Sequence, residues 1–191
     1  MRADDDARAV VHAADLLAAA LRGVTATDGR LAILGNHDPA DMAGELQRIG
    51  FEVLVNRTTE IRRRDDRVRL TGLDDVHSFY TPQARDALSA GSDGFAMALV
   101  HSAELADHAA SAGYALYLSG HTHAGQIALP GGRPVTTQLV RCRDLAVGLW
   151  RHGTLTGHTS SGLGVSRPPV RFNTRGEAAL LTLRRSGTES A

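Results

Sequence analysis

The sequence predicts an α/β protein in which a sheet covered by helices packs against a second, more antiparallel sheet. Helical and strand-like stretches alternate as far as residue 118, and short strand-like stretches then follow one another directly after residue 123. A length of 191 residues suits one domain with its own hydrophobic core. We assign residues 1–185 to that domain and expect residues 186–191 to form a flexible tail.

The part of the chain before residue 119 has the rhythm of helices connecting buried strands. Apolar residues recur at spacings of three and four through residues 5–22, and the acidic run Asp4-Asp5-Asp6 suits the first turn of such a helix. Glycines at 50 and 113 end two later helical patterns. The predicted elements are helix 5–22, strand 31–34, helix 40–49, strand 51–55, an exposed hairpin over 58–73, helix 83–90, strand 95–100, helix 103–112 and strand 114–118.

After residue 123 the apolar pattern becomes short and strand-like. Turn residues at 130–132 separate the first two of these stretches. We expect strands at 126–129, 135–139, 145–150, 154–159 and 178–183. Consecutive short strands favour a second sheet with antiparallel pairing.

Composition excludes several classes of protein. The formal net charge is zero, so no general attraction to nucleic acid or to an anionic membrane is expected. The single cysteine, Cys142, excludes an internal disulfide and a zinc site built from several cysteines. No apolar run approaches the roughly 18 residues that a membrane span needs. The expected location is the cytoplasm by default, or the membrane or exterior if a further segment precedes residue 1.

Three strand ends carry side chains that can bind metal ions. They are Gly35-Asn36-His37-Asp38, Val100-His101-Ser102 and Gly120-His121-Thr122-His123. Each alone has a simpler interpretation, as a turn or as a structural histidine. A His-x-His pair in extended backbone points both rings to one side, and loops after buried strands are held rigidly by the sheet. Together the three motifs therefore predict one shared metal site.

These motifs closely resemble a known family. Leu34-Gly35-Asn36-His37-Asp38, then Leu99-Val100-His101, then the run from Leu118 to Ile127 are similar to the later motifs of the calcineurin-like metallophosphoesterases. Ser161-Gly162-Leu163-Gly164 and the following Val170-Arg171-Phe172-Asn173 resemble the YkuE-like phosphodiesterase branch of that family. The resemblance covers nearly the whole chain.

The resemblance implies a four-layer α/β/β/α sandwich with two divalent metal ions at the strand ends. Asn36, His101 and His121 would bind one ion and His123 the other. His37 would remain unbound and act on the leaving oxygen, with Asp38 orienting its ring. Imidazole and amide ligands suit Mn, Fe, Zn or Ni.

One part of the family pattern is missing from this sequence. The family's Asp-x-His motif and the Gly-Asp motif that supplies a bridging carboxylate would lie before residue 1, so we expect an N-terminally truncated sandwich. All four matched ligands are neutral. Two divalent ions about 3.5 to 4 Å apart repel by roughly 20 kcal/mol at an effective dielectric constant of about 20, and nothing here offsets that repulsion. At most one bound metal ion is expected.

Three interpretations of function remain open. The first, which we favour, is a metal-dependent phosphoesterase whose recorded start is wrong or which is the larger piece of a split enzyme. The second is a non-catalytic metal-binding or regulatory module, and the third is a remnant without a stable fold. Upstream codons for the two missing motifs would distinguish the first. The expected substrates are small phosphate esters or phosphodiesters of lipids or the cell envelope, and the sequence leaves the oligomeric state unknown. Arg133, Arg141, Arg143 and Arg167 are candidate phosphate contacts.

Overall fold

The computed structural model describes residues 2–75, 81–89 and 94–184. The expected tail, residues 186–191, and His77, for which we expect a surface role, lie outside these ranges.

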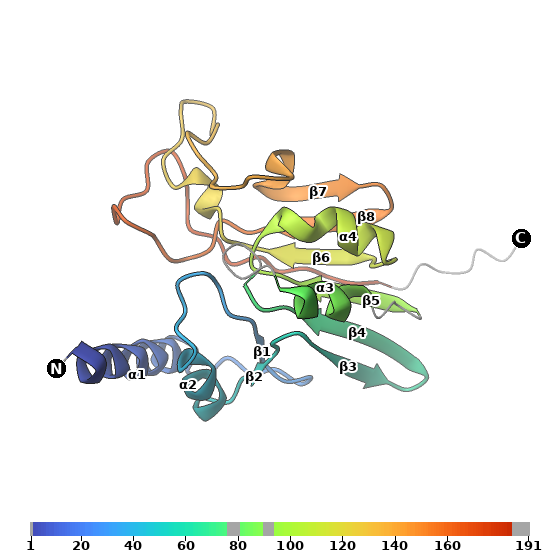
Figure 1. Cartoon of the computed structure of the whole chain (residues 1–191), viewed down its shortest axis with the longest axis horizontal. Helices are drawn as coiled ribbons and strands as arrows, with labels where there is room; N and C mark the ends of the chain where they lie inside the picture. The colour runs from blue at the N-terminus through green and yellow to red at the C-terminus, as the bar shows by residue number, and fades with distance from the viewer. Residues whose placement is uncertain (1, 76–80, 90–93, 185–191) are drawn as a thin grey trace, which may run out of the picture.

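A six-stranded sheet forms the centre of the molecule (Figure 1). Its strand order is β3-β4-β5-β6-β8-β7. The pairs β4–β5, β5–β6 and β6–β8 are parallel, whereas the outer strands β3 and β7 pair antiparallel with β4 and β8. The carboxyl ends of β4, β5, β6 and β8 therefore meet at one edge of the sheet. The bounds are β3 Arg57–Arg63, β4 Asp66–Gly72, β5 Phe95–Leu99, β6 Leu116–Ser119, β7 Gly148–His152 and β8 Leu155–Thr159.

Helices cover one face of this sheet. They are α3 (Pro82–Ser89), the 3-10 turn η1 (Ala103–Leu105) and α4 (Ala106–Ser111), which lie in front of the strands in Figure 1. The main core lies between them and the sheet, and its largest buried rings, Tyr117 and Trp150, have centroids 5.8 Å apart. Small side chains on the helix-facing side of β5, Ala96 and Ala98, let the helices approach the strands closely.

A small sheet and two helices lie on the opposite face. The parallel pair β1 (Leu31–Ala32) and β2 (Glu52–Val53) packs through Leu31 against Leu70, Met97 and Leu116 of the large sheet. Helix α2 (Met42–Arg48) covers the outer side of this pair through Leu46.

Helix α1 (Arg2–Ala20) contacts α2, and Arg48 of α2 binds Asp15 of α1 with an N–O distance of 2.6 Å. The layers therefore run helix, sheet, sheet, helix, and the predicted α/β class is confirmed. The expected second, more antiparallel sheet of late strands is wrong, because β7 and β8 join the six-stranded sheet and the second sheet is the parallel pair β1–β2. None of the helices in the described ranges combines the length and apolar character needed to cross a bilayer.

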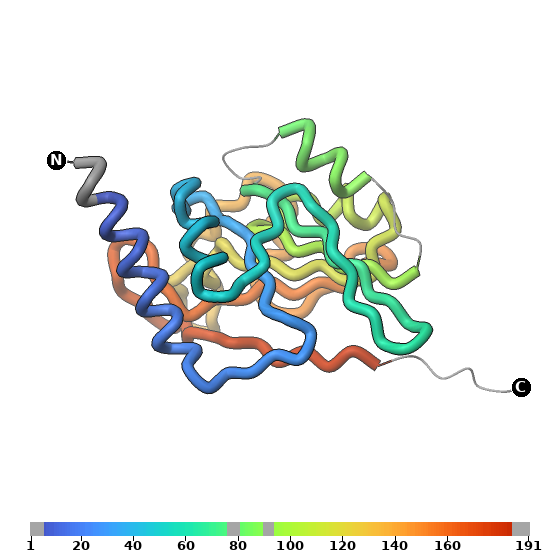
Figure 2. The backbone as a smooth tube through the Cα atoms, turned by 90° about the horizontal axis from the view of Figure 1, so that it is seen from below, coloured from blue at the N-terminus to red at the C-terminus, as the bar shows by residue number. Residues whose placement is uncertain are grey.

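Three of the predicted strands are wrong. Residues 126–129, just after the 3-10 turn η2 (His123–Gly125), form only isolated bridges, Ile127–Phe172 and Ala128–Pro134. Residues 135–139 form neither a strand nor a bridge. Residues 178–183 are extended without strand pairing, and Leu180 keeps 94% of its surface exposed. Figure 2 shows this last segment, in red, running along one side of the molecule. A strand needs a neighbour to pair with, and apolar alternation alone does not supply one. The predicted strand 145–150 also starts later, because η3 (Arg143–Leu145) precedes it.

Candidate metal centre

The three predicted loops meet at the carboxyl edge of the large sheet. His101 follows β5 and His121 follows the adjacent parallel strand β6. The pairing of these strands therefore brings both histidines to neighbouring positions at the carboxyl edge. The ladder continues beyond the strands, since the Gly120 N–H donates to the His101 carbonyl over 3.0 Å. Asn36 arrives from the other layer, four residues after β1. The site therefore forms where the two sheets face each other.

The donor atoms of three predicted ligands lie within hydrogen-bond distance. His101 Nε2 is 3.0 Å from Asn36 Oδ1 and 3.2 Å from His121 Nδ1. The two imidazoles meet edge to face, with centroids 5.0 Å apart and an interplanar angle of 71°. All three side chains are partly buried. We call Asn36, His101 and His121 the donor cluster.

The spacing of the donor cluster fits a metal ion. Ligand atoms bound at about 2.0 to 2.2 Å from one ion lie roughly 3 to 3.5 Å from one another, which is the separation seen at His101 Nε2. Two imidazole nitrogens and one amide oxygen are ligands that Mn, Fe, Zn and Ni accept. Within the described ranges, however, no group of three or more His, Cys, Asp or Glu side chains is arranged to hold a metal ion. No carboxylate from those ranges therefore completes the cluster as a charged ligand.

Gly35 makes room for the donor cluster. A Cβ atom at this position would lie 2.5 to 2.9 Å from three atoms of the His101 ring, which real structures essentially never allow. Gly35 therefore determines how closely His101 can approach Asn36. The sequence indicates only a turn at Gly35, because its neighbouring residues do not show that the ring of His101, 66 positions later, lies against it.

His123 lies on the same loop as His121 but is held separately. Its backbone carbonyl accepts a hydrogen bond of 3.1 Å from the Arg171 guanidinium. Burial lowers the pKa of His123 most, the nearby Arg171 charge lowers it further, and His37 contributes less. A hydrogen bond with the Gly164 backbone raises this pKa, but the net shift is downward. His123 Nδ1 is buried and has no hydrogen-bond partner in the described part of the chain. His123 is therefore favoured in the neutral form that metal binding requires.

His37 and Asp38 are both exposed at the mouth of the site. Asp38 Oδ2 accepts a hydrogen bond of 2.8 Å from the Gly35 N–H, and the Asp38 N–H donates to the Gly35 carbonyl. These bonds close the turn that presents Asn36. The hydrogen bonds of the described residues include none between Asp38 and His37, so the expected orienting role of Asp38 stays a prediction.

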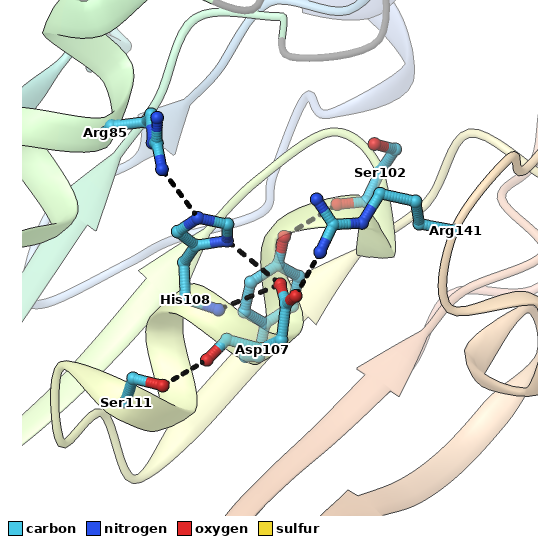
Figure 3. Close-up of polar contacts among 7 residues, drawn as sticks. Arg85, Ser102, Asp107, His108, Ser111 and Arg141 are labelled. Carbon is cyan, nitrogen blue, oxygen red and sulfur yellow. Dashed lines mark hydrogen bonds and ion pairs between the residues drawn. The ribbon is translucent and has the colours of Figure 1, made fainter.

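The four candidate arginines differ in their surroundings. Arg141 forms an ion pair with Asp107, which also accepts a hydrogen bond from the His108 ring (Figure 3). Arg143 Nε donates to the Leu139 carbonyl over 3.0 Å. Arg133 and Arg167 are exposed. Arg141 and Arg143 therefore support the loop before β7, and the phosphate contacts expected of all four stay predictions.

The four layers and the histidine-bearing loops at the carboxyl edge are the arrangement that the sequence resemblance implies. The chain is 32% identical over 171 residues, 86% of its length, to a protein of Bacillus subtilis (strain 168) described as "Uncharacterized metallophosphoesterase YkuE". The match covers 59% of that relative, so the chain spans about three fifths of the relative's length. No family model matches the chain, and no solved structure matches it significantly. This similarity supports the calcineurin-like metallophosphoesterase family that the sequence motifs resemble.

Proposed function

We propose that this chain binds a divalent metal ion through the donor cluster and belongs to a protein that hydrolyses phosphate esters, with phosphodiesters as the substrate class. The observation that carries this proposal is the position of His101 Nε2 within 3.2 Å of donor atoms from two other loops. The similarity to the metallophosphoesterase of Bacillus subtilis supports the hydrolase class and the need for divalent metal ions.

Each residue has a distinct part in the proposed reaction. When bound, a divalent ion would activate water and neutralise phosphate charge. Asn36, His101 and His121 would hold that ion, and His123 would be available as a further ligand. His37, which is exposed and close enough to influence the pKa of His123, donates a proton to the leaving oxygen.

The charge of the donor cluster limits what the chain does alone. Three neutral ligands leave the charge of a divalent ion uncompensated, so binding is weaker than in a site that includes a carboxylate. A second ion nearby would add the repulsion estimated above. We therefore propose one bound ion and low hydrolytic activity for this chain.

The second candidate function is a metal-binding module without catalysis. It is favoured by the lack of a carboxylate beside the donor cluster among the described residues. Such a module would bind the ion with the same three residues but would not hydrolyse a phosphodiester.

One experiment separates the two candidates. The chelator-treated chain is titrated with Mn²⁺ or Zn²⁺ by calorimetry, and hydrolysis of bis(p-nitrophenyl) phosphate is followed in parallel. The matched variants are His101→Ala, in the cluster, and His12→Ala, exposed on α1. Saturable binding that His101→Ala abolishes, with hydrolysis that depends on it, supports the esterase. The same binding without hydrolysis supports the module, and unchanged binding in His101→Ala contradicts both.

A further inference from the structure

The loop that carries His121 and His123 has an unusual backbone. His121, His123, Ala124 and Gln126 have φ values of 67°, 51°, 54° and 55°, and the glycine between the last two is also at positive φ. Side chains with a Cβ atom disfavour this left-handed region. Several such residues in one short loop persist only where surrounding contacts fix them.

Arg171 makes several of those contacts with one guanidinium group. Its Nη1 atom donates to the His123 carbonyl over 3.1 Å. Its Nη2 atom lies 2.6 to 3.0 Å from three further backbone carbonyls, those of Ser161, Gly162 and Gly164. One partly buried guanidinium therefore ties the carbonyl of His123 to the loop that follows β8.

Gln126 connects the loop of His121 and His123 to the segment after β8 at a second position. Its side chain accepts from the Ser166 N–H over 2.7 Å and donates to the Pro168 carbonyl over 2.5 Å. Its own carbonyl accepts from Phe172 N and from Thr174 Oγ1. Residues 161–174 therefore contact the left-handed loop at His123 and at Gln126, and we call them the clamp segment.

We propose that Arg171 is a positioning residue: through its backbone contacts to His123 and to the clamp segment, it fixes where the His123 imidazole lies relative to the donor cluster. The hydrogen bonds of the Arg171 guanidinium go to the carbonyls of His123, of the clamp segment and of Arg175 just after it. His101 and Asn36 instead follow strand ends. Arg171 should therefore affect the position of the His123 ring without affecting His101 or Asn36. This role belongs to the metal-free chain and does not depend on the proposed phosphoesterase function.

The test follows the histidine rings individually. Imidazole ¹H–¹⁵N correlation spectra of the metal-free chain are recorded for Arg171→Gln and Arg171→Lys, with signals assigned through His→Gln variants at positions 101, 121 and 123. Arg175→Gln is the matched control, because it removes the same charge just after the clamp segment, where the Arg175 side chain is exposed. Thermal unfolding of each variant is measured alongside.

We expect the His123 signals to shift or broaden in Arg171→Gln while the His101 signals keep their positions. Arg171→Lys should change His123 in the same direction but less, because an ammonium keeps the charge without the planar fork. Arg175→Gln should leave all of these signals unchanged. The proposal is overturned if His123 is unaffected in the folded Arg171 variants, or if the rings move together. Global unfolding of both Arg171 variants would also overturn it, because the assigned role is local.

Discussion

The ring of His101 lies directly over the α-carbon of Gly35, leaving no space for a side chain there. This contact joins the loop after β1 to the loop after β5 and brings Asn36 Oδ1 to within 3.0 Å of His101 Nε2. The donor cluster therefore depends on a residue that has no donor atom in its side chain.

Gly35→Ala should weaken metal binding by displacing His101. The added methyl group would force the ring or the loop to move, because 2.5 Å is far below a normal contact. We expect at least a tenfold loss of Mn²⁺ affinity by calorimetry. Gly44→Ala is the matched control, since a Cβ in that part of α2 meets nothing within 4 Å and alanine favours helix. Equal affinities in the two variants would show that the contact is unimportant.

His121→Ala and His37→Ala should differ in metal content, although both should lower turnover. The first removes a member of the donor cluster and should empty the site, as measured by bound metal per chain after gel filtration. The second removes an exposed ring outside the cluster and should retain metal while lowering any phosphodiester hydrolysis. Loss of metal in His37→Ala would show that the assigned roles are wrong.

Glu177 should stabilise the fold only above acidic pH. The Ser161 backbone N–H lowers the pKa of Glu177 most, partial burial raises it, and the nearby His158 lowers it further, so the net shift is downward. A carboxyl whose pKa is depressed by folding contributes stability above its unfolded value, about 4.3, and loses it as the pH falls through the folded value.

Glu177→Gln therefore should lower the free energy of unfolding at pH 7 and have a vanishing effect well below pH 4. The expected loss is about 1 kcal/mol or less, since the side chain is partly exposed. Urea unfolding at several pH values measures it, with Asp65→Asn at the exposed turn between β3 and β4 as a control that keeps the clamp segment intact. A loss of the same size at every pH would mean that the charge is not the cause.

Gly157→Ala should destabilise the main core. A Cβ at this position in β8 would lie 2.1 to 2.4 Å from atoms of the Trp150 ring, which is buried and donates to Thr159 Oγ1. We expect a cost of about 1 to 3 kcal/mol, typical of overpacking. The measurement is thermal unfolding beside Gly44→Ala, and restoration by a second change, Trp150→Phe, would trace the cost to this contact.

The sequence predicts much of this fold because buried strands and glycine-ended helices leave local patterns. The apolar run before His101 and the glycine after the helix ending near residue 112 are visible without tertiary information. The convergence of Asn36, His101 and His121 also follows from their places at strand ends. Local patterns do not reveal pairing partners, so residues 178–183 were expected as a strand and lie unpaired. Gly35 and Arg171 act through contacts with segments that are distant in the sequence, and the spacing of residues in the sequence does not predict such contacts.

The two sheets contribute different members of the donor cluster: Asn36 belongs to the layer of β1 and β2, whereas His101 and His121 belong to the six-stranded layer. A cation bound there would cross-link the two sheet layers of the sandwich. Its binding energy would then add to the cohesion of the two halves. Metal loading would register as resistance to heat and to proteolysis near residue 36, even in an assay where no ester bond is broken.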